Sequence, residues 1–140
     1  WKSQFHVREI MNRLYTSLPD GLCGDEDNGQ TSAWYVFSAM GFYPVAPGTG
    51  QYVLGAPLFR KVTLHLEDGK TFVISAPGNS AENRYVSEAK LNDKVYTKNY
   101  LNHSDITKGG ALEFKMNAEP VKTRGIHKED FPYSMSDELK

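Results

Sequence analysis

The spacing of apolar residues changes once along this chain, near Phe42. Before that residue the apolar side chains recur at helical intervals or run together without charge. After it they alternate with polar side chains in short runs bounded by turn residues. Helices followed by strands, without regular alternation of the two, are typical of the α+β class and not of a parallel α/β sheet. We therefore predict an α+β fold in which an N-terminal helix pair in residues 1–43 precedes a mostly antiparallel β-sandwich in residues 44–120.

The first helix is predicted from an apolar stripe that begins at Phe5. Seven apolar residues follow the i, i+3, i+4 and i+7 spacing of an amphipathic helix: Phe5, Val7, Ile10, Met11, Leu14, Tyr15 and Leu18. The opposite face carries Arg8, Glu9, Asn12 and Arg13. Pro19 and Gly21 end this helix of about three turns, because proline disfavours helical backbone in the residue before it and glycine supplies a left-handed turn.

The second predicted helix follows a loop with three consecutive carboxylates. Residues 24–30 read Gly-Asp-Glu-Asp-Asn-Gly-Gln, whereas residues 31–41 carry no charge and are mostly apolar. The segment from Ala33 to Met40 is apolar on nearly every face, which predicts a helix that is buried all round and ends at Gly41. One other helix is not enough to cover such a surface. The chain also opens on Trp1 without a Met, so we expect a piece of a longer polypeptide.

Six short runs after residue 50 are rich in β-formers or alternate in polarity. They span residues 51–54, 61–66, 71–75, 84–91, 94–96 and 111–116. The Asp68-Gly69 pair predicts a tight hairpin turn, and residues 91–94 predict a second turn. We expect six or seven strands with no helix between them. An irregular tail follows in residues 121–140, and four of its residues could pack back on the body: Phe131, Pro132, Tyr133 and Met135.

The charge of the chain excludes several kinds of partner. Its 16 basic and 17 acidic residues give a net charge of −1 and form no long run of either sign. Neither a nucleic acid nor an anionic membrane surface is therefore expected as a partner. No stretch approaches the roughly 18 apolar residues of a membrane span, and the N-terminus lacks the order of a signal peptide. Cys23 is the only cysteine, which excludes an internal disulfide and a cysteine-rich zinc site.

The acidic loop has a structural and a catalytic interpretation. In the structural one, Asp27, Asn28 or Ser32 caps the second helix, where exposed N–H groups and the helix dipole favour a carboxylate by about 0.3–1 kcal/mol. This accounts for one or two of the acids but less well for three in a row between glycines. An EF-hand is excluded by register, because counting from Asp25 places Gly29 fifth, where that loop needs its glycine sixth.

Paired carboxylates fit acid–base chemistry better than a metal site. A calcium site of another kind stays open, because clustered carboxylates suit hard cations, but two or three acids do not complete the shell of six to eight oxygens that calcium takes. In a turn, Asp25 and Asp27 can point to the same side, where two like charges raise one pKa or demand a partner. Glycoside hydrolysis uses one such acid to activate water and another to protonate the leaving oxygen. Because two residues on one loop do not flank a sugar from opposite faces, a general acid from elsewhere is required.

Residues 24–44, continuing through residues 52–59, closely resemble glycoside hydrolase family 92, the exo-acting α-mannosidases. The first segment reads Gly-Asp-Glu-Asp-Asn-Gly-Gln-Thr-Ser-Ala-Trp-Tyr-Val-Phe-Ser-Ala-Met-Gly-Phe-Tyr-Pro. The β-rich remainder as far as Pro120 is also similar to the C-terminal portion of that family. The resemblance implies a calcium-dependent enzyme that hydrolyses α-linked mannose of glycans with inversion. It further implies that residues 1–43 end an (α/α)6 toroid, and it suggests a periplasmic or secreted protein.

The resemblance assigns roles to two residues of the loop. Asp27 matches the general base that acts on the attacking water, and Asp25 matches the second aspartate that assists it. Glu26, between them, is expected to shape the loop. The family's general-acid glutamate lies well upstream, no segment of this chain matches its surroundings, and no calcium ligand is placed here. We therefore expect the 140-residue chain to be inactive without the remainder of the parent polypeptide.

The alternative is a non-catalytic β-sandwich scaffold or carbohydrate-binding module whose helices serve as packing. An enzyme needs Asp25 and Asp27 facing solvent in a concave site, whereas a scaffold would have them satisfied as caps. Three aromatic residues of the second helix could stack on a sugar but are more readily explained as core: Trp34, Tyr35 and Phe37. The histidines have no ligand spacing, and none lies near Cys23 in sequence. Residues 102–104 form a glycosylation sequon by letter only.

Overall fold

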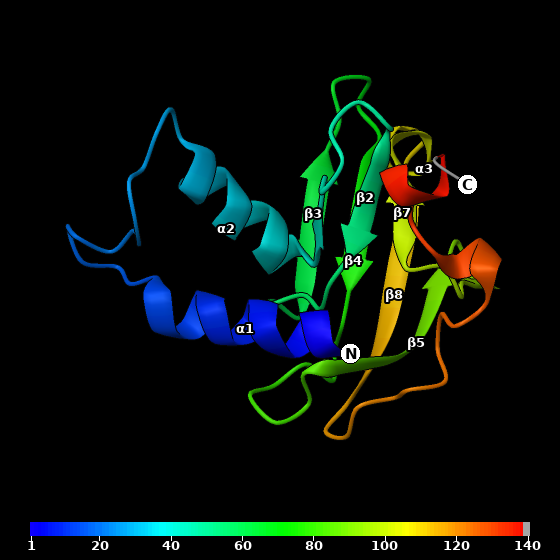
Figure 1. The fold of residues 1–140 in the computed structure, drawn as a ribbon. Helices are drawn as coiled ribbons and strands as arrows, with labels where there is room; N and C mark the ends of the chain where they lie inside the picture. Colours follow the sequence, from blue (N-terminus) through cyan, green and yellow to red (C-terminus); the bar gives the residue numbers. More distant parts are fainter. Residues whose placement is uncertain (139–140) are drawn as a thin grey trace.

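A computed structural model describes residues 1–138 as two helices that lie beside two β-sheets (Figure 1). The helices are α1 (Lys2–Leu14) and α2 (Gln30–Met40), and they project from one side of the β region. Residues 15–29 join them at the end farthest from the sheets (Figure 1). This arrangement confirms the predicted α+β class with an N-terminal helix pair.

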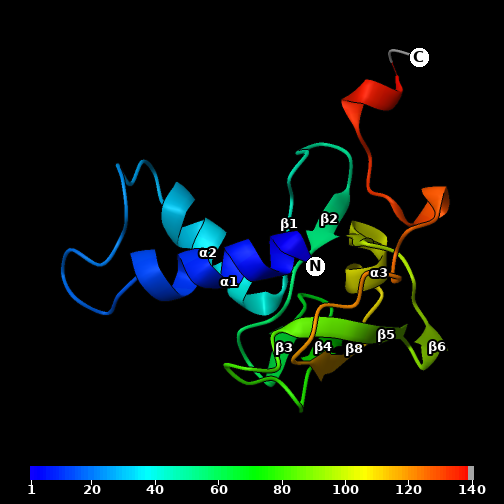
Figure 2. The ribbon, with the colours of Figure 1, turned by 60° about the horizontal axis from the view of Figure 1, so that its bottom comes forward.

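The strands form a three-stranded and a five-stranded sheet. The smaller has the order β1-β2-β7 and contains β1 (Phe42–Tyr43), β2 (Gln51–Leu54) and β7 (Tyr100–Asn102). The larger has the order β3-β4-β8-β5-β6 and contains β3 (Lys61–His65), β4 (Thr71–Ser75), β8 (Gly110–Asn117), β5 (Tyr85–Leu91) and β6 (Lys94–Val95). All paired strands are antiparallel except β4 and β8, which are parallel. Figure 2 shows the larger sheet as one layer with β1 and β2 in another.

Two expectations about the β region are corrected. A short helix, α3 (His103–Thr107), lies between β7 and β8, where no helix was expected. It begins at Asn102 with a capping box in which the Asp105 carboxylate accepts from the Asn102 backbone N–H at 3.0 Å. The predicted strand set also lacked β1 and β7, which are only two and three residues long. Such short strands are defined by their pairing with β2 and not by a local pattern.

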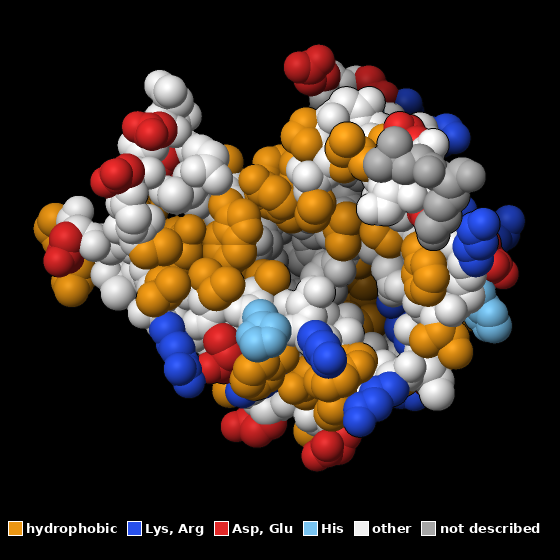
Figure 3. Space-filling model, in the orientation of Figure 1, with side chains coloured by type: hydrophobic (Ala, Val, Ile, Leu, Met, Phe, Trp, Pro, Cys, Tyr) orange, Lys and Arg blue, Asp and Glu red, His pale blue; other side chains and the backbone are white. Residues whose placement is uncertain are grey.

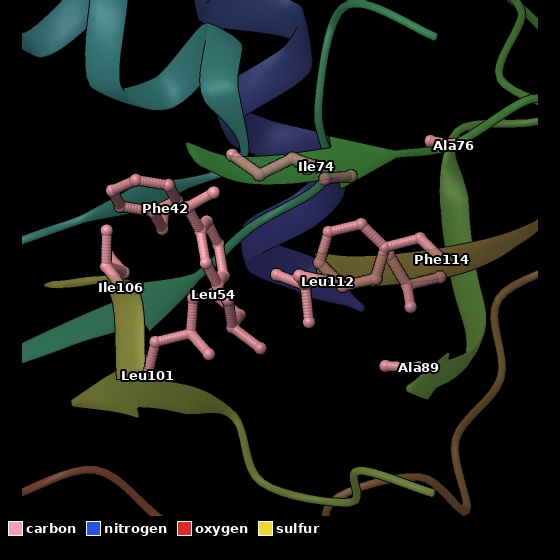
Figure 4. Close-up of a cluster of buried hydrophobic side chains, with 12 residues drawn as sticks. Phe42, Leu54, Ile74, Ala76, Ala89, Leu101, Ile106, Leu112 and Phe114 are labelled. Atoms are coloured by element: carbon pink, nitrogen blue, oxygen red, sulfur yellow. The ribbon is translucent and has the colours of Figure 1, made fainter. Parts of the chain in front are cut away.

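The main core lies between the two sheets and α3. Phe72, Leu101 and Leu112 are each 0% exposed, and Figure 4 shows side chains of both sheets converging with Ile106 of α3. The cluster contains twelve buried residues: Phe42, Leu54, Ala56, Phe72, Ile74, Ala76, Val86, Ala89, Leu101, Ile106, Leu112 and Phe114. Burial of this apolar surface is what holds the sheets face to face.

We predict that Phe72→Ala lowers the free energy of unfolding by about 3–5 kcal/mol, because it removes a whole aromatic side chain from a site with no access to water. Phe59→Ala is the matched control, since Phe59 is 51% exposed, and we expect it to cost less than about 1 kcal/mol. Urea unfolding of both variants measures the difference. Equal losses would contradict the assignment of the core.

Helix α1 turns inward a face that combines Arg8 of its polar side with Met11 of its apolar stripe. Arg8 and Met11 are 4% and 2% exposed, whereas Ile10 and Leu14 of the apolar stripe are 36% and 51% exposed. The helix also ends at Leu14, four residues earlier than the stripe suggested, because Tyr15 has extended backbone.

Helix α2 ends as predicted but is not buried all round within residues 1–138. Gly41 adopts a left-handed φ of 102° and donates its N–H to the carbonyls of Phe37 and Ser38. A Cβ at Gly41 would lie 3.1 Å from the Pro57 backbone nitrogen, so glycine also permits this close approach. Only Ser38 and Ala39 of the helix are buried, and Val36 is 55% exposed.

The tail folds back on the β region through polar residues. Buried Asp130 accepts a hydrogen bond from Thr97 at 2.5 Å, and its backbone carbonyl accepts the N–H of Asn99 at 2.8 Å. Arg124 donates to the carbonyls of Tyr96 and Lys98. Two 3₁₀ turns, η1 (Lys128–Asp130) and η2 (Met135–Asp137), lie in this segment. The tail residues expected to pack back by hydrophobic contact include Phe131 and Met135, which are 51% and 72% exposed.

Candidate active-site loop

The acidic loop lies at the outer end of the helix pair, just before α2. Left-handed backbone at Gly24, Asn28 and Gly29 bends it toward the helix, and the Gln30 N–H donates to the Asp27 carbonyl at 3.0 Å. Glycine and asparagine are the residues that adopt this conformation at lowest cost. Acidic side chains gather at this outer end, beside an apolar surface over the helices (Figure 3).

Glu26 is the residue that satisfies the start of α2. Its carboxylate accepts the backbone N–H groups of Thr31 and Ser32 at 3.3 and 2.8 Å, together with the hydroxyl of Ser32 at 2.8 Å and that of Thr31. The expectation that Asp27, Asn28 or Ser32 caps the helix is therefore wrong. The N-cap position is Gly29, which has no side chain to offer, so the cap comes from an acid three residues earlier.

These hydrogen bonds hold the pKa of Glu26 well below its ordinary 4.5, at about 2, with the Thr31 hydroxyl as the largest cause. As pH falls, the unfolded carboxyl takes up a proton near its ordinary pKa while the folded one stays ionised. The contribution to stability is therefore present above about pH 5 and lost as pH falls toward 2.

We accordingly predict that the difference in unfolding free energy between wild type and Glu26→Gln is constant above about pH 5 and shrinks as pH falls toward 2. Thermal unfolding across that range measures it. A difference that does not change with pH would contradict the capping role. Glu67→Gln, on an exposed turn, is the matched control.

Asp25 and Asp27, in contrast, remain free. Both residues are exposed, and neither side chain has a hydrogen-bond or ion-pair partner among residues 1–138. The middle acid of the triplet is thus structural, while the outer two are available for chemistry. The described residues do not place the two aspartates in a hollow. A hollow of about 430 Å³ beside α2 has a lining that includes neither aspartate: Tyr15, Thr16, Ser17, Leu22, Ser32, Tyr35 and Val36.

The aromatic residues of α2 pack mainly on other side chains. Trp34 stacks on Tyr15 with ring centroids 5.6 Å apart, and Tyr35 lies 5.0 Å from the same ring. Phe37 packs against Phe42 at the edge of the main core. Partial burial, followed by a hydrogen bond with Cys23, raises the pKa of Tyr15 to about 12. Cys23 is partly buried, and its contact with Tyr15 gives it a packing role.

The described residues do not fit a calcium site of their own. No group of three or more His, Cys, Asp and Glu side chains converges within residues 1–138, and the Glu26 carboxylate is committed to α2. Two aspartates fall far short of the six to eight oxygens that calcium takes. The sequon asparagine, Asn102, donates its side-chain amide to Asp105 at 3.1 Å and belongs to the cap of α3.

The sequence did not reveal two buried polar residues that fix the helix pair, Arg8 and Asn79. Arg8 lies on a helix face that reads as solvent-exposed, and Asn79 lies in a loop. No local pattern distinguishes them from surface residues. The sequence carried only a weak indication that Glu26 caps α2. An acid shortly before a Thr-Ser pair at a helix start can accept hydrogen bonds from the N–H and O–H groups of that pair.

The chain is similar to known proteins of one family. Residues 1–118 match the glycosyl hydrolase family 92 catalytic domain. The chain is 56% identical to the family GH92 inverting mannosidase BT2199 from Bacteroides thetaiotaomicron VPI-5482, with a TM-score of 0.91 over 97% of this chain and 18% of that one. The family GH92 α-mannosidase BT3965 from Bacteroides thetaiotaomicron is 41% identical, with a TM-score of 0.91 over 96% of this chain and 18% of that one.

A curated relative from Arthroderma benhamiae, described as an uncharacterized secreted glycosidase, is 32% identical over 91% of this chain and 18% of its own length. The chain therefore spans less than a fifth of each of these relatives. Within residues 1–138 no helix is long and apolar enough to cross a membrane.

Proposed function

This chain belongs to glycosyl hydrolase family 92, and we propose that it is the C-terminal part of an inverting, exo-acting α-mannosidase of the α-1,2 type. Its substrate is α-linked mannose of glycans. One observation carries the proposal. In the acidic loop the Glu26 carboxylate caps α2, whereas the side chains of Asp25 and Asp27 stay exposed. Two relatives are named as mannosidases, one of them inverting.

In the proposed reaction Asp27 is the general base. It accepts a proton from a water molecule whose oxygen bonds to the anomeric carbon of mannose, on the face opposite the glycosidic bond. That bond breaks as a general acid protonates the leaving oxygen, and β-mannose is the first product. Asp25, two residues away, accepts a hydrogen bond from the same water and orients it for attack. In inverting enzymes the two carboxyl groups are about 6.5–9.5 Å apart, so the acid comes from another part of the parent polypeptide.

The helix pair has a surface suited to that remainder. Leu14, Leu18 and Val36 are 51%, 65% and 55% exposed, and the helical side of the molecule is largely apolar in Figure 3. Exposed apolar area of this kind is buried in a complete protein. We propose that residues 1–43 complete an (α/α)6 toroid and that residues 44–120 form the β-sandwich after it.

We propose that the full-length enzyme depends on calcium. Because the described residues do not form a calcium site, its ligands would come from the remainder of the parent chain. Export to the periplasm or beyond is also proposed, and the secreted description of the Arthroderma benhamiae relative supports it.

The test is mannose release by the full-length parent protein from an α-1,2-linked mannobiose, with calcium and with a chelator. We expect release from the α-linked substrate, none from a β-linked mannobiose, and a loss of rate on chelation that calcium restores. Absence of release with calcium present would favour the alternative, a non-catalytic scaffold or carbohydrate-binding module. A rate insensitive to chelation would remove calcium from the proposal and leave the hydrolase.

A further inference from the structure

We infer that Arg8 and Asn79 are positioning residues, which fix the direction of the helix pair and thereby the place of Asp27. This inference rests on the proposed function. Neither residue belongs to the acidic loop or to any hollow beside it. They act through a polar clamp, defined here as Arg8, Asn79 and the segment 55–58, to which both helices are bound.

Arg8 attaches α1 to this clamp. Its guanidinium donates to the Pro57 carbonyl at 2.6 Å and to the Asn79 side-chain oxygen at 2.9 Å, with a longer contact of 3.4 Å to the Ser80 carbonyl. No carboxylate binds it among residues 1–138, and its Nε is buried without a partner there. A buried cation held by carbonyl oxygens alone is costly to build, which argues for a geometric role over a stabilising one.

Asn79 carries the connection to the second helix. Its side-chain NH₂ donates to the Leu58 carbonyl at 2.7 Å, while the Leu58 N–H donates to the Ala39 carbonyl near the end of α2 at 2.9 Å. The Gly55 N–H also donates to the Gly41 carbonyl at 2.8 Å. One segment therefore holds the sheet-side end of α2 and the middle of α1.

Both helices extend from this clamp toward the acidic loop. A small change in the direction of a helix at the clamp therefore displaces the loop at its far end. At about 1.5 Å per residue, the arm from Arg8 to Leu14 is about 9 Å and that from Ala39 to Gln30 is about 14 Å, so a tilt of about 5° moves the loop ends by roughly 0.8 and 1.2 Å. A displacement of about 1 Å at a catalytic group can cost about 10²-fold in rate. Nearer the loop, Tyr15 contacts α2 through the stacked ring of Trp34 and the tilted ring of Tyr35, and ring contacts specify direction less strictly than hydrogen bonds.

The test uses the full-length parent protein and the variant Arg8→Lys. Lysine keeps the charge and length but has one compact donor group, so it does not reproduce the fork to Pro57 and Asn79. Arg13→Lys is the matched control, because Arg13 lies on the same helix with a side chain that is 76% exposed. We expect kcat for an aryl α-mannoside to fall about 10-fold or more in Arg8→Lys, with KM within about threefold, and to stay within about twofold in Arg13→Lys.

A double-mutant cycle separates positioning from general loss of structure. If Arg8 acts by placing Asp27, Arg8→Lys should have almost no further effect on the residual rate of Asp27→Ala. Equal fold losses in both backgrounds, or an unchanged kcat in a folded Arg8→Lys protein, would overturn the inference. Asn79→Asp is the second variant if Arg8→Lys unfolds, since it keeps an acceptor for Arg8 while its added carboxylate oxygen repels the Leu58 carbonyl that Asn79 binds, and the same loss of kcat is expected. An Asp27→Ala protein with full activity would instead overturn the proposed function.

Discussion

Asp27→Ala in the full-length parent protein is expected to lower kcat for α-mannoside hydrolysis by about 10²–10⁴-fold, the usual contribution of a positioned general base. The residue is exposed, and its carboxylate has no partner among residues 1–138. It is therefore available to take a proton from water. The variant should fold normally, because the helix is capped by Glu26 and loses no hydrogen bond when the Asp27 side chain is removed.

Asp20→Ala is the matched control for that experiment. Asp20 is an exposed aspartate in the same connection between α1 and α2, outside the acidic triplet. We expect it to change kcat less than about twofold. Circular dichroism and thermal unfolding show whether each variant is folded. Unchanged turnover in a folded Asp27→Ala protein would return the acidic loop to a structural role.

The isolated 140-residue chain is expected to release no mannose under conditions where the full-length parent turns over many times. The reason is geometric. Asp25 and Asp27 share one loop and approach a sugar from one side, so the proton needed by the leaving oxygen has no donor on the other side. Without that acid, and without walls around the exposed loop, the water attack is neither oriented nor driven.

The same preparation should nevertheless be folded, which distinguishes a missing catalytic group from a missing structure. Its main core, centred on Phe72 and Leu112, lies wholly within residues 42–114. A cooperative urea transition with no mannose release is the expected pair of results. Mannose release by the isolated chain above a heat-treated control would show that a general acid is present in it.

The sequence predicted the elements whose signals are local. The strands β2 and β4 lie where alternation and flanking turns placed them, and α2 ends at Gly41 as expected. The elements that escaped prediction are set by distant partners. β1 and β7 exist because they pair with β2. The parallel pairing of β4 with β8 depends on how the chain crosses between them.

The orientation of α1 shows most clearly what a helical pattern does not determine. Its apolar stripe indicated a helix but not which face would meet the sheets. In the structure the carbonyls of Pro57 and Ser80 and the side chain of Asn79 favour the face that carries Arg8. Ile10 and Leu14 of the apolar stripe stay exposed, whereas its Met11 is buried. In the loop, the residue pattern alone marked three acids together and the family resemblance set Glu26 apart; its contacts with Thr31 and Ser32 supply the physical reason.

The most direct test of the central claim is the configuration of the first mannose released by the full-length parent protein, followed by proton NMR at early times. The account predicts that the β-anomer appears first and then equilibrates with the α-anomer, because water activated by Asp27 attacks opposite the leaving group. Appearance of the α-anomer first would mean retention, with a carboxylate acting as nucleophile. That result would contradict Asp27 as the base of an inverting mannosidase.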